Sequence, residues 1–90
     1  METTKTHVAW YDIFDEYQRA IEKFPPFNSA HEGIAVIKEE YDELWNWVRT
    51  KKEARLTAEM RKEAMQLAAM AMRFMIDCCE ENKSTPGLRG

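Results

Sequence analysis

Glycine, proline and cysteine are scarce in this sequence, with three, three and two copies among 90 residues. Together with a content of 44% hydrophobic and 32% charged residues, this scarcity suits a soluble, mostly helical protein of one small domain. The two cysteines, Cys78 and Cys79, are adjacent, and neighbouring side chains on a helix point about 100° apart. They are therefore poor partners for each other, and no second pair exists to build a disulfide framework.

Long apolar runs and an excess of basic charge are also missing. No apolar stretch reaches membrane-spanning length, and the first residues, METTKTHVAW, lack the basic-then-apolar order of a signal peptide. The net charge of −3 provides no basic field to attract nucleic acid or an anionic membrane. We therefore expect a cytoplasmic protein that binds neither nucleic acid nor membrane.

Apolar side chains recur at helical spacing in three blocks, which predicts an all-α helical bundle with three helices per chain. The first helix is expected from about Thr6 to Phe24, and Pro25-Pro26 ends it. The three helices form a single domain over residues 1–81, and residues 82–90 are expected to form a flexible C-terminal tail.

Two further helices are expected after the proline pair. A capping box formed by Ser29 and Glu32 predicts a second helix from about Ala30 to position 49 or 50. Thr57 is a candidate N-cap for the third helix, which is expected to continue to about Glu80. The turn between these helices contains neither glycine nor proline, so its boundaries are the least defined part of the prediction.

The third helix is apolar on nearly every side over residues 64–79, AMQLAAMAMRFMIDCC. The two other helices of so short a chain cannot surround such a helix. We therefore expect self-association, most simply a homodimer whose long helices complete a four-helix bundle core, with a dimer of dimers as the alternative. Trp10 and Trp45 are interpreted as core residues.

Four acidic residues lie within IKEEYDELWNWV, residues 37–48 of the second helix. At about 100° per residue, Glu39 and Asp42 fall on the solvated side. Glu40 and Glu43 fall beside the main apolar seam, where carboxylates lose hydration and need a cation, a basic side chain or a place at the bundle edge. For this helix alone, glutamates that snorkel at a core boundary remain the alternative. The seam consists of Ile34, Ile37, Tyr41, Leu44 and Val48.

A strip of polar residues interrupts the apolar third helix. Glu63 and Gln66 lie one turn apart on this strip and are expected to face Glu40 and Glu43 inside the bundle. Three carboxylates and one amide oxygen are hard ligands that suit Mg²⁺ or Mn²⁺. The sequence has no Glu-x-x-His pair, which argues against a di-iron carboxylate site.

The stretches Glu40-Tyr41-Asp42-Glu43 and Glu63-Ala64-Met65-Gln66 resemble the paired Glu-x-x-Glu and Glu-x-x-Asp motifs of the MazG-like all-α nucleoside triphosphate pyrophosphohydrolases. This resemblance, over roughly residues 30–80, implies a Mg²⁺-dependent enzyme that cleaves (deoxy)nucleoside triphosphates to monophosphates and pyrophosphate. It also implies that Glu40, Glu43 and Glu63 are metal ligands. One of these carboxylates, or Glu39, would orient the attacking water.

Gln66 stands where the family has aspartate. Its amide offers an oxygen to a metal but carries no charge, so it should bind Mg²⁺ more weakly, and a site with several metals can lose one ion. This departure keeps a second hypothesis open, a catalytically silent nucleotide-binding or helical interaction module of the same fold. A purely structural helical dimer is a third reading.

Four residues are candidate substrate contacts, and each has a structural alternative. Arg73 either binds phosphate or forms an ion pair with Asp77 or Glu43. Trp47 either stacks on the base or packs in the core or dimer interface, and Lys51 either contacts phosphate or belongs to a solvated loop. Asp77, further along the polar strip, is a candidate for restoring the charge that the amide lacks.

Overall fold

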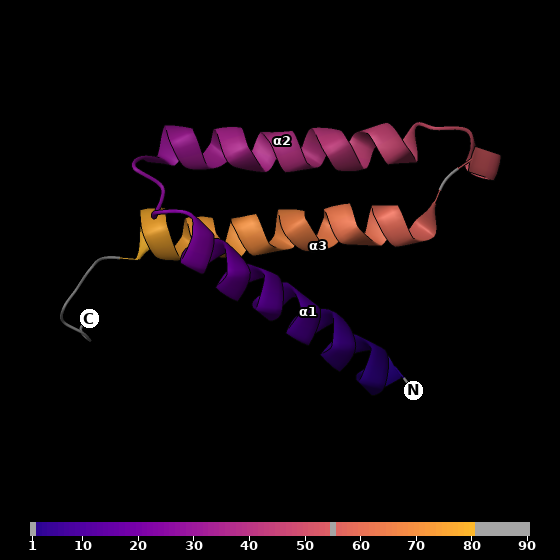
Figure 1. The fold of residues 1–90 in the computed structure, drawn as a ribbon, viewed down its shortest axis with the longest axis horizontal. Coiled ribbons are helices and arrows are strands. Elements are labelled where there is room, and N and C mark those ends of the chain that lie inside the picture. The colour runs from indigo at the N-terminus through magenta and orange to yellow at the C-terminus, as the bar shows by residue number, and fades with distance from the viewer. Residues whose placement is uncertain (1, 55, 81–90) are drawn as a thin grey trace.

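Three α-helices make up the described part of the chain, which comprises residues 2–54 and 56–80 of the computed structural model (Figure 1). No strand occurs in these residues, which confirms the all-α prediction. None of the described helices has the length and apolar character needed to cross a membrane. The tail predicted for residues 82–90 lies outside the described residues. The helices are α1 (Glu2–Lys23), α2 (Ala30–Val48) and α3 (Thr57–Phe74).

The start of α2 agrees with the capping residues predicted from the sequence, and the start of α3 does not. At α2, Ser29 Oγ accepts the N–H of Glu32 at 3.1 Å, and the Glu32 carboxylate accepts the N–H of Asn28, one residue before the cap. At α3 the N-cap is Leu56, whose backbone is extended and whose carbonyl accepts the first helical N–H groups. The prediction of Thr57 as the cap is therefore wrong, because Thr57 is already inside the helix.

Two helix ends differ from the predicted boundaries. α1 begins at Glu2, ahead of the predicted start, because polar residues that carry no apolar periodicity extend a helix nucleated further along. α3 ends at Phe74, and Met75–Cys79 continues it as a π-helical turn. Apolar residues continue without a break through this turn, so the sequence holds no signal for the wider backbone spacing.

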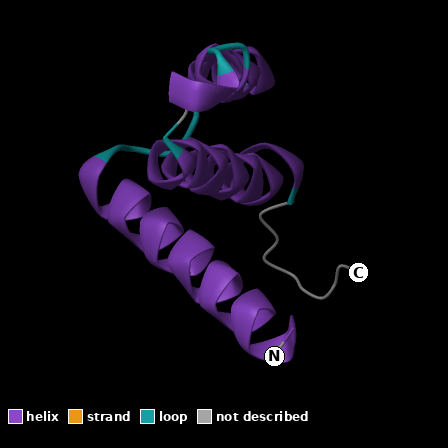
Figure 2. Ribbon diagram, turned by 90° about the vertical axis from the view of Figure 1, so that its right-hand side faces the viewer, coloured by secondary structure: helices purple, strands orange, loops and turns teal. Residues whose placement is uncertain are grey.

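α3 lies between the other two helices (Figures 1 and 2). It packs along α2, to which a short turn containing the 3₁₀ segment Lys52–Ala54 connects it, and it also packs against α1. α1 runs obliquely to α3: its C-terminal end lies beside the C-terminal end of α3, and the two helices diverge toward the N-terminus of α1 (Figure 1). Asp12, halfway along α1, still forms an ion pair with Arg61 of α3 at 2.8 Å. Because α1 and α2 hardly touch each other, the described chain is an open arrangement of helices.

The single chain has very little core. Ala20 and Ala69 are its only buried hydrophobic residues among those described, and no large side chain is fully buried. Trp10 is 56% exposed and Trp45 is 49% exposed, so their interpretation as core residues is wrong for one chain. Helical spacing shows which residues share a face, but it does not show whether a neighbour of the same chain covers that face.

α2 faces α3 with a different strip from the seam that its apolar residues predict. Ile34 and Tyr41 on the predicted seam are 54% and 52% exposed. Gly33 is buried, and a Cβ atom added to it would lie 2.7 Å from Cδ2 of Phe74. Glu40, on the strip beside the seam, is partly buried. The acidic strip of α2 therefore lies toward α3, while much of the apolar seam faces outward.

Candidate metal centre and adjoining cleft

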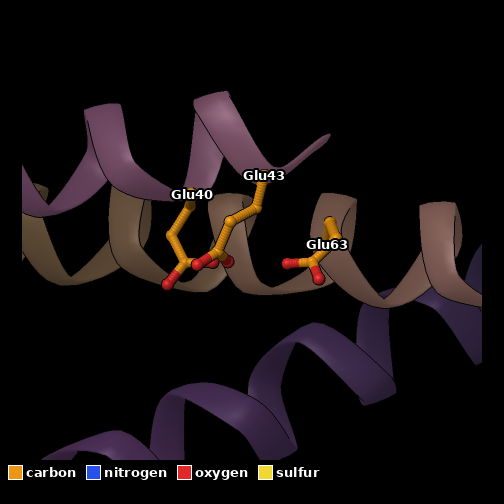
Figure 3. Close-up of side chains that lie close together, drawn as sticks. All are labelled: Glu40, Glu43 and Glu63. Carbon is orange, nitrogen blue, oxygen red and sulfur yellow. The ribbon is translucent and has the colours of Figure 1, made fainter. Parts of the chain in front are cut away.

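Three glutamates from two helices converge at the α2–α3 contact (Figure 3). Glu40 and Glu43 are one turn apart on α2, and Glu63 projects from α3 toward them. Each offers a carboxylate oxygen, and these oxygens all lie within 4.8 Å of one another. The structure thus brings together the three acids that helical spacing places on facing strips.

Two of the three glutamates, Glu40 and Glu63, have raised pKa values, whereas the side chain of Glu43 is exposed. Glu63 is only 9% exposed. Burial, then repulsion by Glu43 and Glu63, raises the pKa of Glu40 to about 7. Burial and then a hydrogen bond to Glu43 raise the pKa of Glu63. Among the described residues no lysine or arginine forms an ion pair with any of the three, and only the nearby charge of Lys62 partly offsets the rise in the pKa of Glu63.

Gln66 lies against the same carboxylates, one turn after Glu63. With its amide nitrogen turned inward, it donates to Oε1 of Glu40 and to Oε1 of Glu63, each at 3.3 Å. A half-turn of the amide presents its oxygen to the same two groups instead. Gln66 is therefore positioned either to hold the acids together as a donor or to join them as an oxygen ligand.

The donor set fits a hard divalent cation. Carboxylate and amide oxygens are the ligands that Mg²⁺, Mn²⁺ and Ca²⁺ prefer, and a buried acid group without a basic partner is stabilised by a cation. The residues that would hold such an ion are Glu40, Glu43 and Glu63, with Gln66 as a neutral fourth ligand. Their arrangement does not by itself select one metal.

A cleft of about 680 Å³ adjoins the acids and is bounded by the end of α1, the start of α2 and the middle of α3. Glu40 and Gln66 line it, as does Glu39, which is exposed on α2. Its volume is in the range of small-molecule sites in proteins. Of the three glutamates only Glu40 lines the cleft, so the cleft meets the acidic cluster at Glu40 and Gln66.

Arg73 lines the same cleft but is bound into the packing of the helices. It is 3% exposed and donates to Oδ2 of Asp77 at 3.0 Å, to the carbonyl of Ala20 at 3.0 Å and to the carbonyl of Phe24 at 2.6 Å. These carbonyls lie at the C-terminal end of α1, where that of Ala20 also accepts the backbone N–H of Phe24 at 3.0 Å. Asp77 also accepts the N–H of Phe27 at 3.0 Å. These contacts favour the ion pair that the sequence left open as the alternative for Arg73.

The remaining candidate substrate contacts do not line the cleft. Trp47 is partly buried near the end of α2, and Lys51 is exposed in the turn that follows. Neither residue is among those that line the cleft, nor is Asp77. Their proposed roles toward a substrate stay predictions.

The cleft has a wall that the sequence reasoning missed. Arg19 and Lys23, one turn apart on α1, line it together with the exposed ring of Phe24. A signal for them existed in the sequence, since both cations fall on one face of the last turns before Pro25-Pro26. The sequence does not reveal, however, that this end of α1 folds back beside the acids.

Comparison with models of protein families, with curated proteins and with solved structures finds no match to this chain.

Proposed function

We propose that the chain is a Mg²⁺-dependent nucleoside triphosphate pyrophosphohydrolase of the MazG-like kind, which converts (deoxy)nucleoside triphosphates to monophosphates and pyrophosphate. The observation that carries this proposal is the convergence of Glu40, Glu43 and Glu63, without an ion-pair partner in the described part of the chain, beside a cleft of about 680 Å³ that Glu40 lines. The resemblance of the two motifs to that family supplies the reaction.

The chemistry follows from charge. A triphosphate is a polyanion that a purely acidic site would repel, and Mg²⁺ neutralises phosphate oxygens and lowers the pKa of a bound water. Glu40, Glu43 and Glu63 hold the ion in this proposal. One of these carboxylates, or Glu39, which is exposed and lines the cleft, orients the attacking water in this proposal.

One observation favours the second hypothesis, a silent nucleotide-binding module. Gln66 carries no charge, and with its nitrogen inward it forms hydrogen bonds to Glu40 and Glu63 that occupy the oxygens a metal would use. Such a site would bind a nucleotide complexed with one metal ion but would not turn it over. Turnover is therefore the property that separates the two hypotheses.

A panel of ribo- and deoxynucleoside triphosphates, incubated with and without Mg²⁺ and assayed for pyrophosphate, tests the proposal. Glu40→Gln should abolish release. Asp42→Asn is the matched control, because Asp42 lies on the same helix but forms an exposed ion pair with Lys38 at 2.9 Å. Release of single phosphate, or equal loss in both variants, would count against the hydrolase. Binding without turnover would support the silent module.

We also propose that the protein is a homodimer, or a dimer of dimers, in which a second copy completes the bundle. The support is the thin core of the single chain and the outward-facing row on α2. This row falls within one helical face, so a partner helix can cover it as a unit. The sequence suggested α3 as the interface helix, and the exposed row leads us to propose that α2 also forms much of the interface between the copies. The row consists of Ile34, Tyr41, Trp45 and Val48.

A further inference from the structure

The wall of the cleft formed by α1 carries two cations and one acid, Glu16, which is paired with Arg19. Arg19 and Lys23 project from consecutive turns of α1 and line the same hollow as Glu39, Glu40 and Gln66. The two walls come from segments about 20 residues apart in sequence, joined by the connection through the proline pair. A cleft with carboxylates on one side and cations on the other suits a ligand that itself combines a metal ion with several anionic groups.

The cations that line the cleft differ in the hydrogen bonds and ion pairs that they already form within the protein. Arg73 is committed to Asp77 and to two carbonyls of α1. Arg19 is exposed and paired with Glu16 at 2.6 Å, an ion pair within one helix that solvent weakens. Lys23 is exposed and forms no ion pair among the described residues. Lys23 is therefore the cation of the cleft that is freest to meet a ligand.

The C-terminal end of α1 repels an anion less strongly than an uncapped helix C-terminus does. The exposed carbonyls of a last turn carry partial negative charge. Here Arg73 donates to the carbonyls of Ala20 and Phe24, so a guanidinium group sits directly at that end. Arg19 and Lys23 therefore border the cleft from α1, and Arg73 borders it from α3. Two acids, Glu16 and Glu32, also line this end of the cleft, and Lys23 is the cation there without an ion pair among the described residues.

We infer that Lys23, assisted by Arg19, binds the phosphate groups of the substrate that extend away from the metal centre. The inference rests on the proposed function for the class of ligand, a polyphosphate complexed with a divalent cation. The acidic wall would hold the metal ion, and Lys23 and Arg19 would bind the phosphate charge that the metal does not neutralise. A triphosphate is therefore bound more tightly than a monophosphate, which cannot reach both walls.

The test uses inorganic tripolyphosphate with Mg²⁺ as the probe, titrated into the full chain by isothermal titration calorimetry. Lys23→Ala should weaken binding at least fivefold, Arg19→Ala should weaken it less, and Lys23→Arg should retain it within about twofold, as expected for a charge-assisted contact. Lys5→Ala is the matched control, since Lys5 is an exposed lysine near the other end of α1. Equal affinities of Lys23→Ala and Lys5→Ala, or no binding by the unchanged protein, would overturn the inference.

Pyrophosphate release measured on the same variants separates this inference from the proposed function. If Mg²⁺-tripolyphosphate binds in a Lys23-dependent manner but no nucleotide is hydrolysed, the phosphate-binding wall stands and the hydrolase fails. If nucleotides are hydrolysed and Lys23→Ala leaves KM unchanged, the hydrolase stands and the wall fails. If both hold, Lys23→Ala raises KM with a smaller effect on kcat.

Discussion

Glu40→Gln should stabilise the metal-free protein at alkaline pH, although it removes a proposed ligand. The pKa of Glu40 rises from its ordinary 4.5 to about 7, because burial and the neighbouring glutamates disfavour the charged form. Since the folded state holds this proton more tightly than the unfolded state, the stability that Glu40 contributes is complete below about pH 4.5. It is lost as the pH rises through about 7.

The size of this effect follows from the same values. A rise from 4.5 to about 7 corresponds to about 3.4 kcal/mol, at about 1.36 kcal/mol per pH unit. Glu40 is only partly buried, so solvent screening reduces the figure to about 1–2 kcal/mol. Glutamine has the same shape without the charge, and we expect the variant to exceed the unchanged protein by this amount at pH 8 and to match it near pH 5. Some pH dependence will remain, because Glu63 is unchanged and its pKa is also raised.

Chemical denaturation in the presence of a chelator, at pH 5 and pH 8 and at one fixed protein concentration, measures the difference. Asp42→Asn is the control: it loses an exposed ion pair worth about 0.3–0.5 kcal/mol and should leave the pH dependence unchanged. Adding Mg²⁺ at about ten times its Kd should then stabilise the unchanged protein by about 1.4 kcal/mol, but not Glu40→Gln. If Glu40→Gln is the less stable protein at pH 8 without metal, the reasoning about crowded carboxylates is refuted.

Three other substitutions test separate features of the structure. Gln66→Asp should strengthen Mg²⁺ binding about tenfold by adding a charged ligand, and should destabilise the metal-free protein at pH 8; calorimetry that shows no gain in affinity would remove Gln66 from the metal site. Gly33→Ala should lower the free energy of unfolding by about 1–3 kcal/mol, because its methyl group would meet the ring of Phe74 at 2.7 Å, and an unchanged denaturation midpoint would contradict this close packing. Trp45→Glu should convert a dimer to a monomer in sedimentation experiments, with Trp10→Glu as a comparison on α1; a dimer that persists would exclude the α2 row from the interface.

The sequence predicts local structure well where a specific side chain determines it. Ser29 and Glu32 mark the start of α2 because capping is a short-range interaction between a side chain and nearby backbone groups. The π-helical turn after Phe74 and the cap at Leu56 carry no such side-chain signal, so neither was predicted. Boundaries set by backbone geometry alone are therefore the part of the secondary structure that periodicity misses.

The residues of the candidate site also differ in whether the sequence predicts their positions. Glu40, Glu43 and Glu63 were predictable because their spacing places them on strips that must meet if α2 and α3 pack as neighbours. The position of Arg19 and Lys23 beside the acids was not, since it depends on the angle at which α1 lies against α3. The angle between two helices depends on packing over their whole contact, so the residue pattern on one face of one helix does not determine it.

The polar strip along α3 and the π-helical turn after it contacts both other helices, because α3 lies between them. Its first half, with Glu63 and Gln66, turns toward the acids of α2. Its second half, with Arg73 and Asp77, is bound to the end of α1 and to the connection after it. Breaking a buried pair of this kind costs about 3–5 kcal/mol, so the hydrogen bonds of Arg73 fix the position of α1 relative to α3. They thereby fix the distance between the wall formed by α1 and the acidic wall of the cleft, and this makes Arg73 a positioning residue for the proposed site even without direct contact to a substrate.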